Sequence, residues 1–284
     1  MQAIAAILFV KGVMVGSIYA LISLGFNVIY QTTGVLNFAQ GEFVMLGGVI
    51  AGWAYATGSV PLIPALLLGV GGAAVAGLLV DAIAIRPVRR AKPVIPVIVT
   101  VGVAIILRSV TALIWGTEPM HLPPLIRGSA KILGVPVEYQ NLCILATAAL
   151  CMAGLALFFR YTATGMAMRA CSEDPGAARL CGVNPGRMSA YSFALSAALA
   201  GVGGVLLTPV VSMSFDRGTM LGLKGFAAAI LGGLGHPVAG VICGILLGIL
   251  EQFSTWFSSV YKETLAFAVV VVVLLARPMG LWGK

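Results

Sequence analysis

Nine apolar runs, separated by short breaks rich in proline, glycine or charge, cover most of this sequence. A helix of roughly 20 apolar residues crosses the hydrocarbon core of a bilayer, and most of the runs reach or approach that length. The runs are Ile4–Tyr30, Glu42–Ala56, Pro61–Ile85, Val94–Trp115, Gln140–Phe159, Arg187–Val211, Leu223–Leu234, Pro237–Phe257 and Tyr261–Ala276. Leu223–Leu234 predicts a half-helix or a re-entrant arm, because about 12 residues at about 1.5 Å each give only roughly 18 Å. The sequence therefore predicts an all-α membrane protein, a polytopic helical bundle of about eight to nine segments with discontinuous or re-entrant helices.

Composition excludes the main alternatives to such a bundle. Of the 284 residues, 60% are hydrophobic and only 9% are charged, whereas a soluble domain carries roughly 25% charged residues. These few charges cannot cover a water-facing surface, so we exclude a soluble enzyme and a disordered chain. A β-barrel is excluded as well, because its strands show as alternating segments of about ten residues. The 36 glycines instead suit helices that pack closely in lipid.

No cofactor, metal or nucleic-acid partner is predicted. The net charge is +8, but no basic stretch is interleaved with aromatic residues in the way that a nucleic-acid-binding face requires. The five cysteines and two histidines show neither a metal-ligand spacing nor a disulfide pattern. Membrane lipid is therefore the only surrounding that the composition indicates.

Basic residues gather on one side of the predicted membrane. Arg86–Lys92 contains four, Arg160–Arg187 contains four more, and the C-terminal tail contains two. Because cytoplasmic loops are enriched in Lys and Arg, this side is predicted to be cytoplasmic, with the N-terminus outside and the C-terminus inside. Residues 1–284 then form a single transmembrane domain, with an outer segment at Gly116–Tyr139. The opposite side is expected to hold Arg127, Lys131, Arg217, Lys224 and Lys262.

The inner segment Arg160–Arg187 contains the pattern of a short capped helix over Ser172–Gly182. Ser172 is expected to cap its N-terminus, and Glu173 and Asp174 suit the positive first turn. Pro175 is tolerated there because its missing N–H has no partner within a helix. Gly182 supplies the left-handed residue that ends the helix. The alternative is an ordinary loop with an incidental helical turn.

Two polar breaks interrupt the apolar runs, and the first is Gln31–Gly41. It carries amides and hydroxyls without any charge, and non-helical backbone at membrane depth is tolerated only where protein buries it or where it lines a cavity. Asn37 is placed to cap the helix that follows, with Gln40 returning the bond in a capping-box variant. Glu42 falls in the first turn of that helix.

The second break is the run from Gly232 to Pro237, in which Pro237 is expected to open a helix with His236 at its cap. Each break places a helix N-terminus in or near the membrane, one in each half of the chain. Paired discontinuous helices place substrate sites in transporters, and an N-terminus favours an anionic group such as a carboxylate. The alternative is that the breaks only relieve helix packing. The candidate pathway residues are Asn37, Gln40, Glu42, Gly233, Gly235 and His236.

A few other charged residues lie within the runs. Glu42 and Glu251 are either functional intramembrane acids or acids that sit at an interface or pair with a base. Arg108 lies about two turns inside its predicted helix and is expected to snorkel. The sequence contains no G-x-x-x-x-G-K-[ST] phosphate loop and no chain of acids that marks a proton relay. A pump built on this chain therefore needs its energy from another protein.

Three segments resemble the branched-chain amino acid ABC transporter permeases, specifically the smaller of their two paired permease subunits. Gly34–Gly48 (GVLNFAQGEFVMLGG) is similar to the signature stretch of that family. Gly165–Gly204 (GMAMRACSEDPGAARLCGVNPGRMSAYSFALSAALAGVGG) is similar to its cytoplasmic loop and the next helix, and Gly222–Glu251 to its glycine-rich re-entrant stretch. The resemblance runs along nearly the whole chain. The residues at His236-Pro237 and Asp216-Arg217 depart from the pattern of that family, and these departures leave the identity of the substrate open.

The resemblance implies a multi-pass importer subunit in the bacterial inner membrane, with no ATPase site of its own. It implies a second related permease, two cytoplasmic ATP-binding subunits and a periplasmic substrate-binding protein as partners, so that Gly116–Tyr139 is periplasmic. Its substrates are expected to be branched-chain amino acids or related small hydrophobic amino acids, amides or carboxylates. Ser172–Gly182 is then the coupling helix, and polar contacts to the ATPase are expected from Arg169, Glu173, Asp174 and Arg179.

Three other functions compete with this expectation. A sugar or nucleoside permease of the same superfamily is one, although the amino-acid sequence of Asn37–Glu42 favours the amino-acid branch. A carrier or channel that works alone is supported by the paired breaks and weakened by the missing charge relay. A membrane-embedded enzyme lacks a convincing nucleophile, metal cluster or general-base pair.

Overall fold

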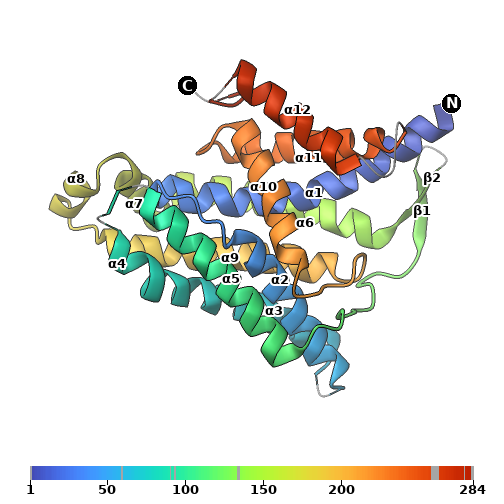
Figure 1. Cartoon of the computed structure of the whole chain (residues 1–284), viewed down its shortest axis with the longest axis horizontal. Helices are drawn as coiled ribbons and strands as arrows, with labels where there is room; N and C mark the ends of the chain where they lie inside the picture. The colour runs from blue at the N-terminus through green and yellow to red at the C-terminus, as the bar shows by residue number, and fades with distance from the viewer. Residues whose placement is uncertain are drawn as a thin grey trace.

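The structure is a computed structural model that describes residues 2–58, 60–89, 91–92, 94–132, 135–256, 262–277 and 279–282. The elements, shown in Figure 1, are α1 (Gln2–Thr33), α2 (Gln40–Ala56), α3 (Leu62–Val80), the π-helix η1 (Asp81–Ile85), α4 (Arg86–Val88), α5 (Val94–Trp115), β1 (Ser129–Ile132), β2 (Val135–Glu138), α6 (Tyr139–Tyr161), α7 (Ala163–Glu173), α8 (Pro175–Leu180), α9 (Pro185–Leu207), α10 (Arg217–Gly232), α11 (Pro237–Ser254) and α12 (Lys262–Ala276).

The predicted class, an all-α polytopic membrane protein, is confirmed. Six helices among the described residues are long and apolar enough to cross a membrane, namely those that begin at Ile4, Leu62, Val94, Tyr139, Pro185 and Pro237. The three shorter helices α2, α10 and α12 fall on the remaining predicted runs. Each of the nine runs therefore falls on helix, and the run Pro61–Ile85 covers both α3 and η1.

The strands β1 and β2 form an antiparallel hairpin inside the predicted outer segment, with Ser129 opposite Glu138 and Ile132 opposite Val135. A separate bridge joins Met120 to Met213, with Met120 N donating to Met213 O at 2.8 Å. The bridge ties the connection after α5 to the connection before α10. These short pairings hold the loops at one end of the helices.

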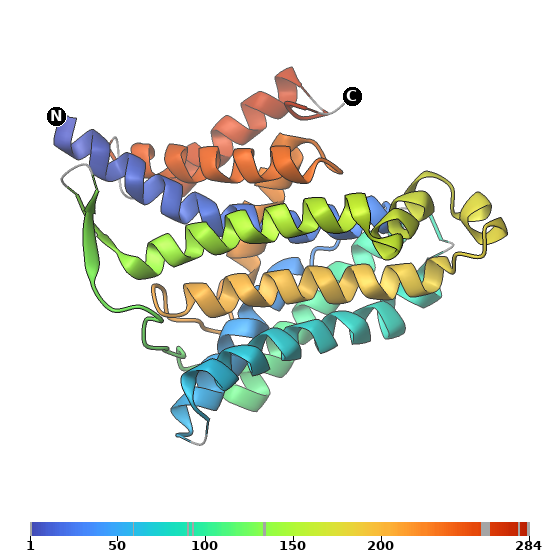
Figure 2. The same ribbon diagram turned by 180° about the vertical axis from the view of Figure 1, so that it is seen from behind.

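The helix α9 forms the centre of the bundle and is the most buried of the six long helices. Seen from behind in Figure 2, α9 runs between α6 and α3, while α1 packs along α11 on the other side. Lipid supplies no hydrophobic drive between helices, so close packing of small residues holds such a bundle together. A Cβ on Gly47 would lie only 2.6 Å from Gly201 Cα, and one on Gly204 would overlap the Val44 carbonyl oxygen. The small residues of α9 thus let α2 approach at backbone distance.

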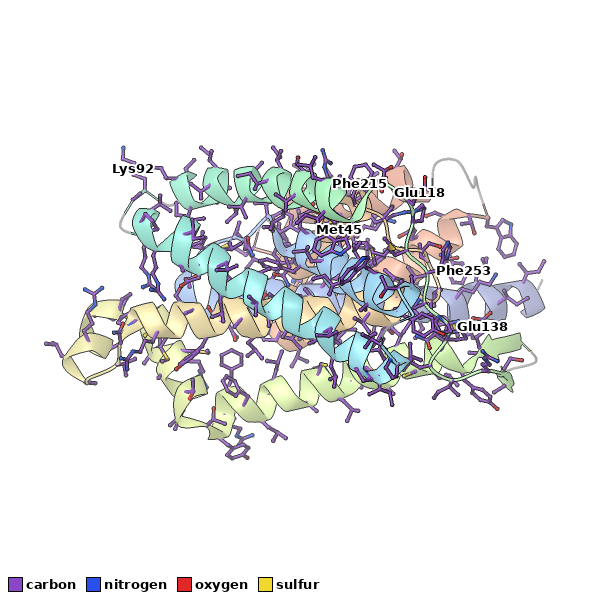
Figure 3. The ribbon with its side chains drawn as sticks, turned by 90° about the horizontal axis from the view of Figure 1, so that it is seen from below. Met45, Lys92, Glu118, Glu138, Phe215 and Phe253 are labelled. Atoms are coloured by element: carbon purple, nitrogen blue, oxygen red, sulfur yellow. The ribbon has the colours of Figure 1, made fainter. Side chains whose placement is uncertain are left out.

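The two ends of the bundle differ in the elements that they carry. The α4 region and the α7–α8 segment lie together at one end, called the basic end below, and the β1–β2 hairpin lies at the other (Figure 1). Figure 3 shows Lys92 at the basic end and Glu118 and Glu138 toward the hairpin. The two loops that the sequence assigns to one side of the membrane are therefore on one side of the structure.

The helices α2 and α10 are short, and α10 crosses the direction of α1 and α11 (Figure 1). They pack through glycines, because a Cβ on Gly222 would lie 3.0 Å from Gly41 Cα. The helix α10 begins at Arg217, six positions before the predicted run, after a turn in which Arg217 N donates to Ser214 O at 3.2 Å. In that turn the Ser214 hydroxyl donates to Asp216 Oδ1 and holds the pKa of this exposed carboxyl below its usual value.

Candidate functional site

The first break follows α1 and spans residues 34–39, and its polar groups bond to neighbouring helices. Asn37 Oδ1 accepts from Ala39 N at 3.1 Å, and the N-cap position of α2 is Ala39, which makes no side-chain cap bond. The predicted capping box of Asn37 and Gln40 is therefore wrong. Gln40 forms hydrogen bonds with α9 instead. Its Nε2 donates to Ser196 O at 3.2 Å, and its Oε1 accepts from Ser196 Oγ at 2.8 Å.

The backbone of this break packs against α5. Phe38 N donates to Thr100 Oγ1 at 3.2 Å, and Thr100 Oγ1 lies 3.4 Å from Leu36 O and 2.8 Å from Val97 O. Protein therefore covers this non-helical backbone, as membrane depth requires. Asn37 Nδ2 is buried and has no hydrogen-bond partner among the described residues.

Glu42 lies beside this break, in the first turn of α2, and is 1% exposed. Thr219 Oγ1 on α10 donates to Glu42 Oε1 at 2.8 Å. The other oxygen, Oε2, is buried without a hydrogen-bond partner among the described residues. Glu42 also lines a cavity of about 170 Å³ between α5 and α10. The position of Glu42 in a first helical turn is as predicted, and its role stays open.

Arg108 lines the same cavity from α5 and is half-buried. The sequence predicts a snorkelling arginine here, whereas the structure brings its side chain to the wall of the cavity that Glu42 lines. Sequence spacing gave no sign of this shared cavity, because the two residues lie on separate helices.

The second break is a tight turn between α10 and α11 that α1 holds in place. Gly233 and Gly235 have φ angles of 89° and 88°, in the left-handed region that favours glycine. Gly235 N donates to Asn27 Oδ1 at 2.9 Å, and Gln31 Nε2 donates to Gly235 O at 2.6 Å. His236 is the N-cap of α11, as predicted, and is exposed without a side-chain cap bond.

A cavity of about 350 Å³ lies at this turn and is lined by Gln31, Gly235, His236, Pro237, Val238, Ala239, Ile242 and Trp282. Sequence reasoning missed Asn27 and Gln31, although two amides near the end of an apolar run were a usable signal. The structure brings both breaks to the same end of α1. Of the six candidate pathway residues, Glu42 lines one cavity, and Gly235 and His236 line the other.

A buried ion pair joins α10 to α11. Lys224 Nζ lies 2.9 Å from Glu251 Oε1, and Tyr19 on α1 donates its hydroxyl to Glu251 Oε2 at 2.7 Å. These residues line a cavity of about 250 Å³. Lys224, expected at the outer side of the membrane, is 8% exposed and lies inside the bundle. The carboxylate of Glu251 compensates the charge there, and the side of the membrane on which Lys224 lies stays a prediction. The alternative that Glu251 pairs with a base is confirmed.

The helical segment at the basic end is divided in two, and Asp174 rather than Ser172 is the cap. Asp174 Oδ1 accepts from Gly176 N at 2.7 Å and from Ala177 N at 3.1 Å. Ser172 lies inside α7, so its predicted role as the cap is wrong. The reason is Pro175, which disfavours the helical conformation at the residue before it. Asp174 accordingly has φ −148° and ψ 102°.

The end of α8 is as predicted, with Gly182 in the left-handed conformation at φ 81°. Val183 N donates to Ala178 O at 3.0 Å and Gly182 N to Arg179 O at 3.0 Å, which together form a Schellman motif. The helix projects beyond the bundle (Figures 1 and 2). The residues exposed on α7 and α8 include Arg169, Ser172, Glu173, Asp174, Arg179 and Leu180.

Leu180 is 92% exposed, which is exceptional for a large apolar side chain outside the membrane-spanning helices. Sequence reasoning missed it, although an apolar residue between Arg179 and the end of a short helix was a visible signal. A protein-binding surface that covered this side chain would remove its apolar area from water. The exposed charges around Leu180 fit the polar rim of such a surface.

A polar cluster links η1 to the start of α9, next to this surface. Asp81 is fully buried and accepts a hydrogen bond from Ser189 Oγ at 2.5 Å and one from Arg86 Nε at 3.2 Å. Arg89 Nη2 donates to Pro185 O at 2.6 Å. Burial lowers the pKa of Arg89, and the negative charge of Asp81 acts in the opposite direction. Sequence reasoning missed this cluster.

Comparison with known proteins places this arrangement in a family. The sequence profile described as "Branched-chain amino acid transport system / permease component" matches residues 8–274. The BraD permease protein of the high-affinity branched-chain amino acid transport system of Pseudomonas aeruginosa is 34% identical, over 97% of this chain and 94% of that protein. The corresponding LivH protein of Escherichia coli K12 is 34% identical, over 96% and 94%.

A more distant relative is the LivM permease protein of the same kind of transport system in Salmonella typhimurium. It is 27% identical, over 93% of this chain and 67% of its own length. No solved structure matches the chain.

Proposed function

The chain belongs to the branched-chain amino acid transport system permease family, and we propose that it is the transmembrane permease subunit of a bacterial ABC importer in the inner membrane. Its substrates are branched-chain amino acids or related small hydrophobic amino acids, amides or carboxylates. The observation that carries this proposal is the pair of interrupted helices that meet at the end of α1, since transporters place substrate sites at such interruptions. The pathway residues are Asn37, Gln40, Glu42, Gly233, Gly235 and His236.

The basic end faces the cytoplasm and the hairpin end faces the periplasm. The concentration of Arg and Lys in the loops at the basic end supports this orientation. A second permease subunit of the LivM kind completes the pathway, and its likeness to this chain supports a pseudo-symmetric pair. A periplasmic binding protein delivers the substrate at the hairpin end.

Two cytoplasmic ATP-binding subunits supply the energy, and the α7–α8 segment couples them to the permease. The coupling residues are Arg169, Ser172, Glu173, Asp174, Arg179 and Gly182. The exposed Leu180 and the projection of α8 from the bundle support this docking surface. The sequence carries no phosphate-binding loop, so the chain acts as a transport subunit rather than as an ATPase.

Reconstitution of the five-component system in liposomes tests the proposal. The chain, its LivM-type partner, the two ATPase subunits and the binding protein are expected to give ATP-dependent uptake of leucine, isoleucine or valine. Omission of the chain or of ATP should abolish uptake. Gradient-driven uptake by the chain alone would instead establish a carrier, and ATP-dependent uptake of a sugar or nucleoside but of no amino acid would establish the other superfamily branch.

A further inference from the structure

We infer that the cavity lined by Glu42 and Arg108 binds the zwitterionic end of the substrate, with the ammonium group at Glu42 and the carboxylate at Arg108. The inference rests on the proposed amino-acid transport and assigns opposite ends of the substrate to two named side chains. A free amino acid carries both charges next to one apolar side chain. Its binding site therefore needs an anion, a cation and an apolar wall within one small space.

The anion is Glu42, which is built to accept one more hydrogen bond. Its carboxylate is 1% exposed, and Thr219 satisfies only Oε1. Oε2 is buried without a hydrogen-bond partner among the described residues. A buried charged group that lacks a partner is costly, so such an atom calls for a donor that is not part of the chain. An ammonium group offers three donors and a compensating charge.

The cation is Arg108, which reaches the same cavity from α5. It is not part of the salt bridges found among the described residues, which join Arg86 to Asp81 and Lys224 to Glu251. Its guanidinium group is planar and can bind a carboxylate through two parallel hydrogen bonds. A substrate in this cavity therefore meets one charge from α2 and the other from α5.

The remaining wall of the cavity is apolar and suits a small hydrophobic side chain. Phe26 and Phe38 line it, and the ring of Phe38 is fixed by Phe226, with ring centroids 4.9 Å apart. Ile105 and Leu223 complete the wall from α5 and α10. The volume of about 170 Å³ suits a small solute. The aromatic side chains make this part of the wall apolar, so it disfavours strongly hydrated groups.

We expect the cavity to open toward water or protein and not toward lipid. Ile105 and Val101 at its rim are 56% and 44% exposed, yet the cavity holds two charged groups, which are expensive against hydrocarbon. The rim therefore faces the water-filled pathway or the second permease proposed above. The ion pair of Lys224 and Glu251 does not offer a similar binding site, because each carboxylate oxygen of Glu251 already has a partner within the chain.

Protection from a thiol reagent measures occupancy of the cavity without relying on uptake. In a background that lacks the native five cysteines, Leu223→Cys or Val101→Cys is introduced into the complete importer. The thiol is expected to react with a small water-soluble maleimide. Millimolar leucine should slow that reaction, whereas leucinamide, which lacks the carboxylate, and 4-methylpentanoate, which lacks the ammonium group, should not.

Charge-neutral variants test the two ends separately. Arg108→Met should remove protection by leucine and lower leucine uptake by about tenfold or more, the loss expected for one charged hydrogen-bonding partner. Glu42→Gln, which keeps the acceptor for Thr219, should do the same. Arg108→Lys should restore part of both signals. Lys11→Met, at an exposed position of α1 outside the cavity, is the matched control and should leave protection and uptake unchanged.

The outcomes separate this inference from the proposed function. Loss of protection in Arg108→Met and Glu42→Gln, with insertion and ATPase assembly intact, supports it. Cysteines at both positions that stay unreactive, or leucine protection that survives both variants, overturn it. In those cases ATP-dependent leucine uptake by the unmodified complex still upholds the proposed function, whereas absence of that uptake removes the function and the inference together.

Discussion

Lys224 and Glu251 form an ion pair inside the bundle, with Nζ of Lys224 2.9 Å from Oε1 of Glu251 and both side chains at most 10% exposed. Removal of one partner takes from the other buried charge the attraction between ammonium and carboxylate. We therefore expect Lys224→Met and Glu251→Leu to lower the free energy of unfolding by roughly 3–5 kcal/mol each. Thermal unfolding of the detergent-solubilised protein measures the loss.

The double variant Lys224→Met/Glu251→Leu is the control for this prediction. It removes both charges and retains apolar volume, so it should be clearly more stable than either single variant. Equal stability of the single and double variants would show that the two charges do not depend on each other.

The cap of α8 makes a second prediction, which separates Asp174 from Ser172. Asp174→Ala removes the acceptor for Gly176 N and Ala177 N and should cost about 1 kcal/mol of local helix stability. Because α8 is the proposed docking element, stimulation of the ATPase by loaded binding protein should fall. Ser172→Ala, inside α7, removes no cap bond of α8 and should reduce stimulation less than Asp174→Ala, and Asp174→Asn should retain most of it. A larger loss of stimulation in Ser172→Ala than in Asp174→Ala would support Ser172 as the cap, as the sequence predicted.

Leu180 provides a third prediction about the same surface. Its side chain is 92% exposed, so Leu180→Asp should leave folding and membrane insertion intact. In the assembled importer the carboxylate would face the apolar contact of the ATPase, and ATPase copurification with the chain should fall severalfold. Leu180→Met keeps the apolar surface and should copurify normally. Unchanged copurification of Leu180→Asp would place the ATPase contact elsewhere.

Most helices could be predicted because hydropathy over a long run is a local property of the chain. The run that began at Leu223 was too short because Arg217, Gly218 and Thr219 lower the hydropathy of the first turns of α10. Lys224 lies within the run, and its charge is compensated inside the bundle by Glu251. That compensation joins residues from two helices, so it cannot be recognised from the sequence of either helix alone. The position of Asp174 before Pro175, in contrast, was a local signal that predicts the helix break.

The candidate sites could be predicted only as positions along the chain. Polar residues between the apolar runs marked Asn37, Gln40 and Glu42. The partners of Gln40 and Glu42, however, are Ser196 and Thr219, which lie 156 and 177 positions away. Sequence reasoning assigns Gln40 to a capping box because it considers as partners only residues that are close along the chain. In the structure, the longer reach to α9 satisfies both ends of the amide, so the local bond is not formed.

Close helix packing makes a fourth prediction, at Gly204. A Cβ on this residue would overlap the carbonyl oxygen of Val44 on α2 and lie 3.0 Å from Gly48 N. Because backbone atoms cannot move aside as a flexible side chain can, Gly204→Ala should destabilise the bundle by roughly 1–3 kcal/mol. Gly154→Ala on α6, where no neighbouring atom lies within 4 Å, is the matched control and should be neutral or slightly stabilising. Comparable unfolding midpoints for the two variants would contradict the close approach of α2 to α9.

The turn between α10 and α11 makes the last prediction, because its backbone conformation and its bonds to α1 can be tested separately. Gly235 has φ 88°, and the atoms nearest to an added Cβ are those of Tyr30 at 3.8 and 3.9 Å, which is ordinary contact. Gly235→Ala should therefore cost roughly 1–3 kcal/mol through backbone strain alone, and Gly235→Asn should cost less, since Asn tolerates positive φ. Asn27→Ala leaves the N–H of Gly235 without its acceptor, a loss of roughly 1–3 kcal/mol. Hydrogen exchange at residues 233–240 measures each effect. If the Asn27→Ala variant exchanges no faster there than the unmodified chain, α1 does not hold this turn, and its cavity has another support.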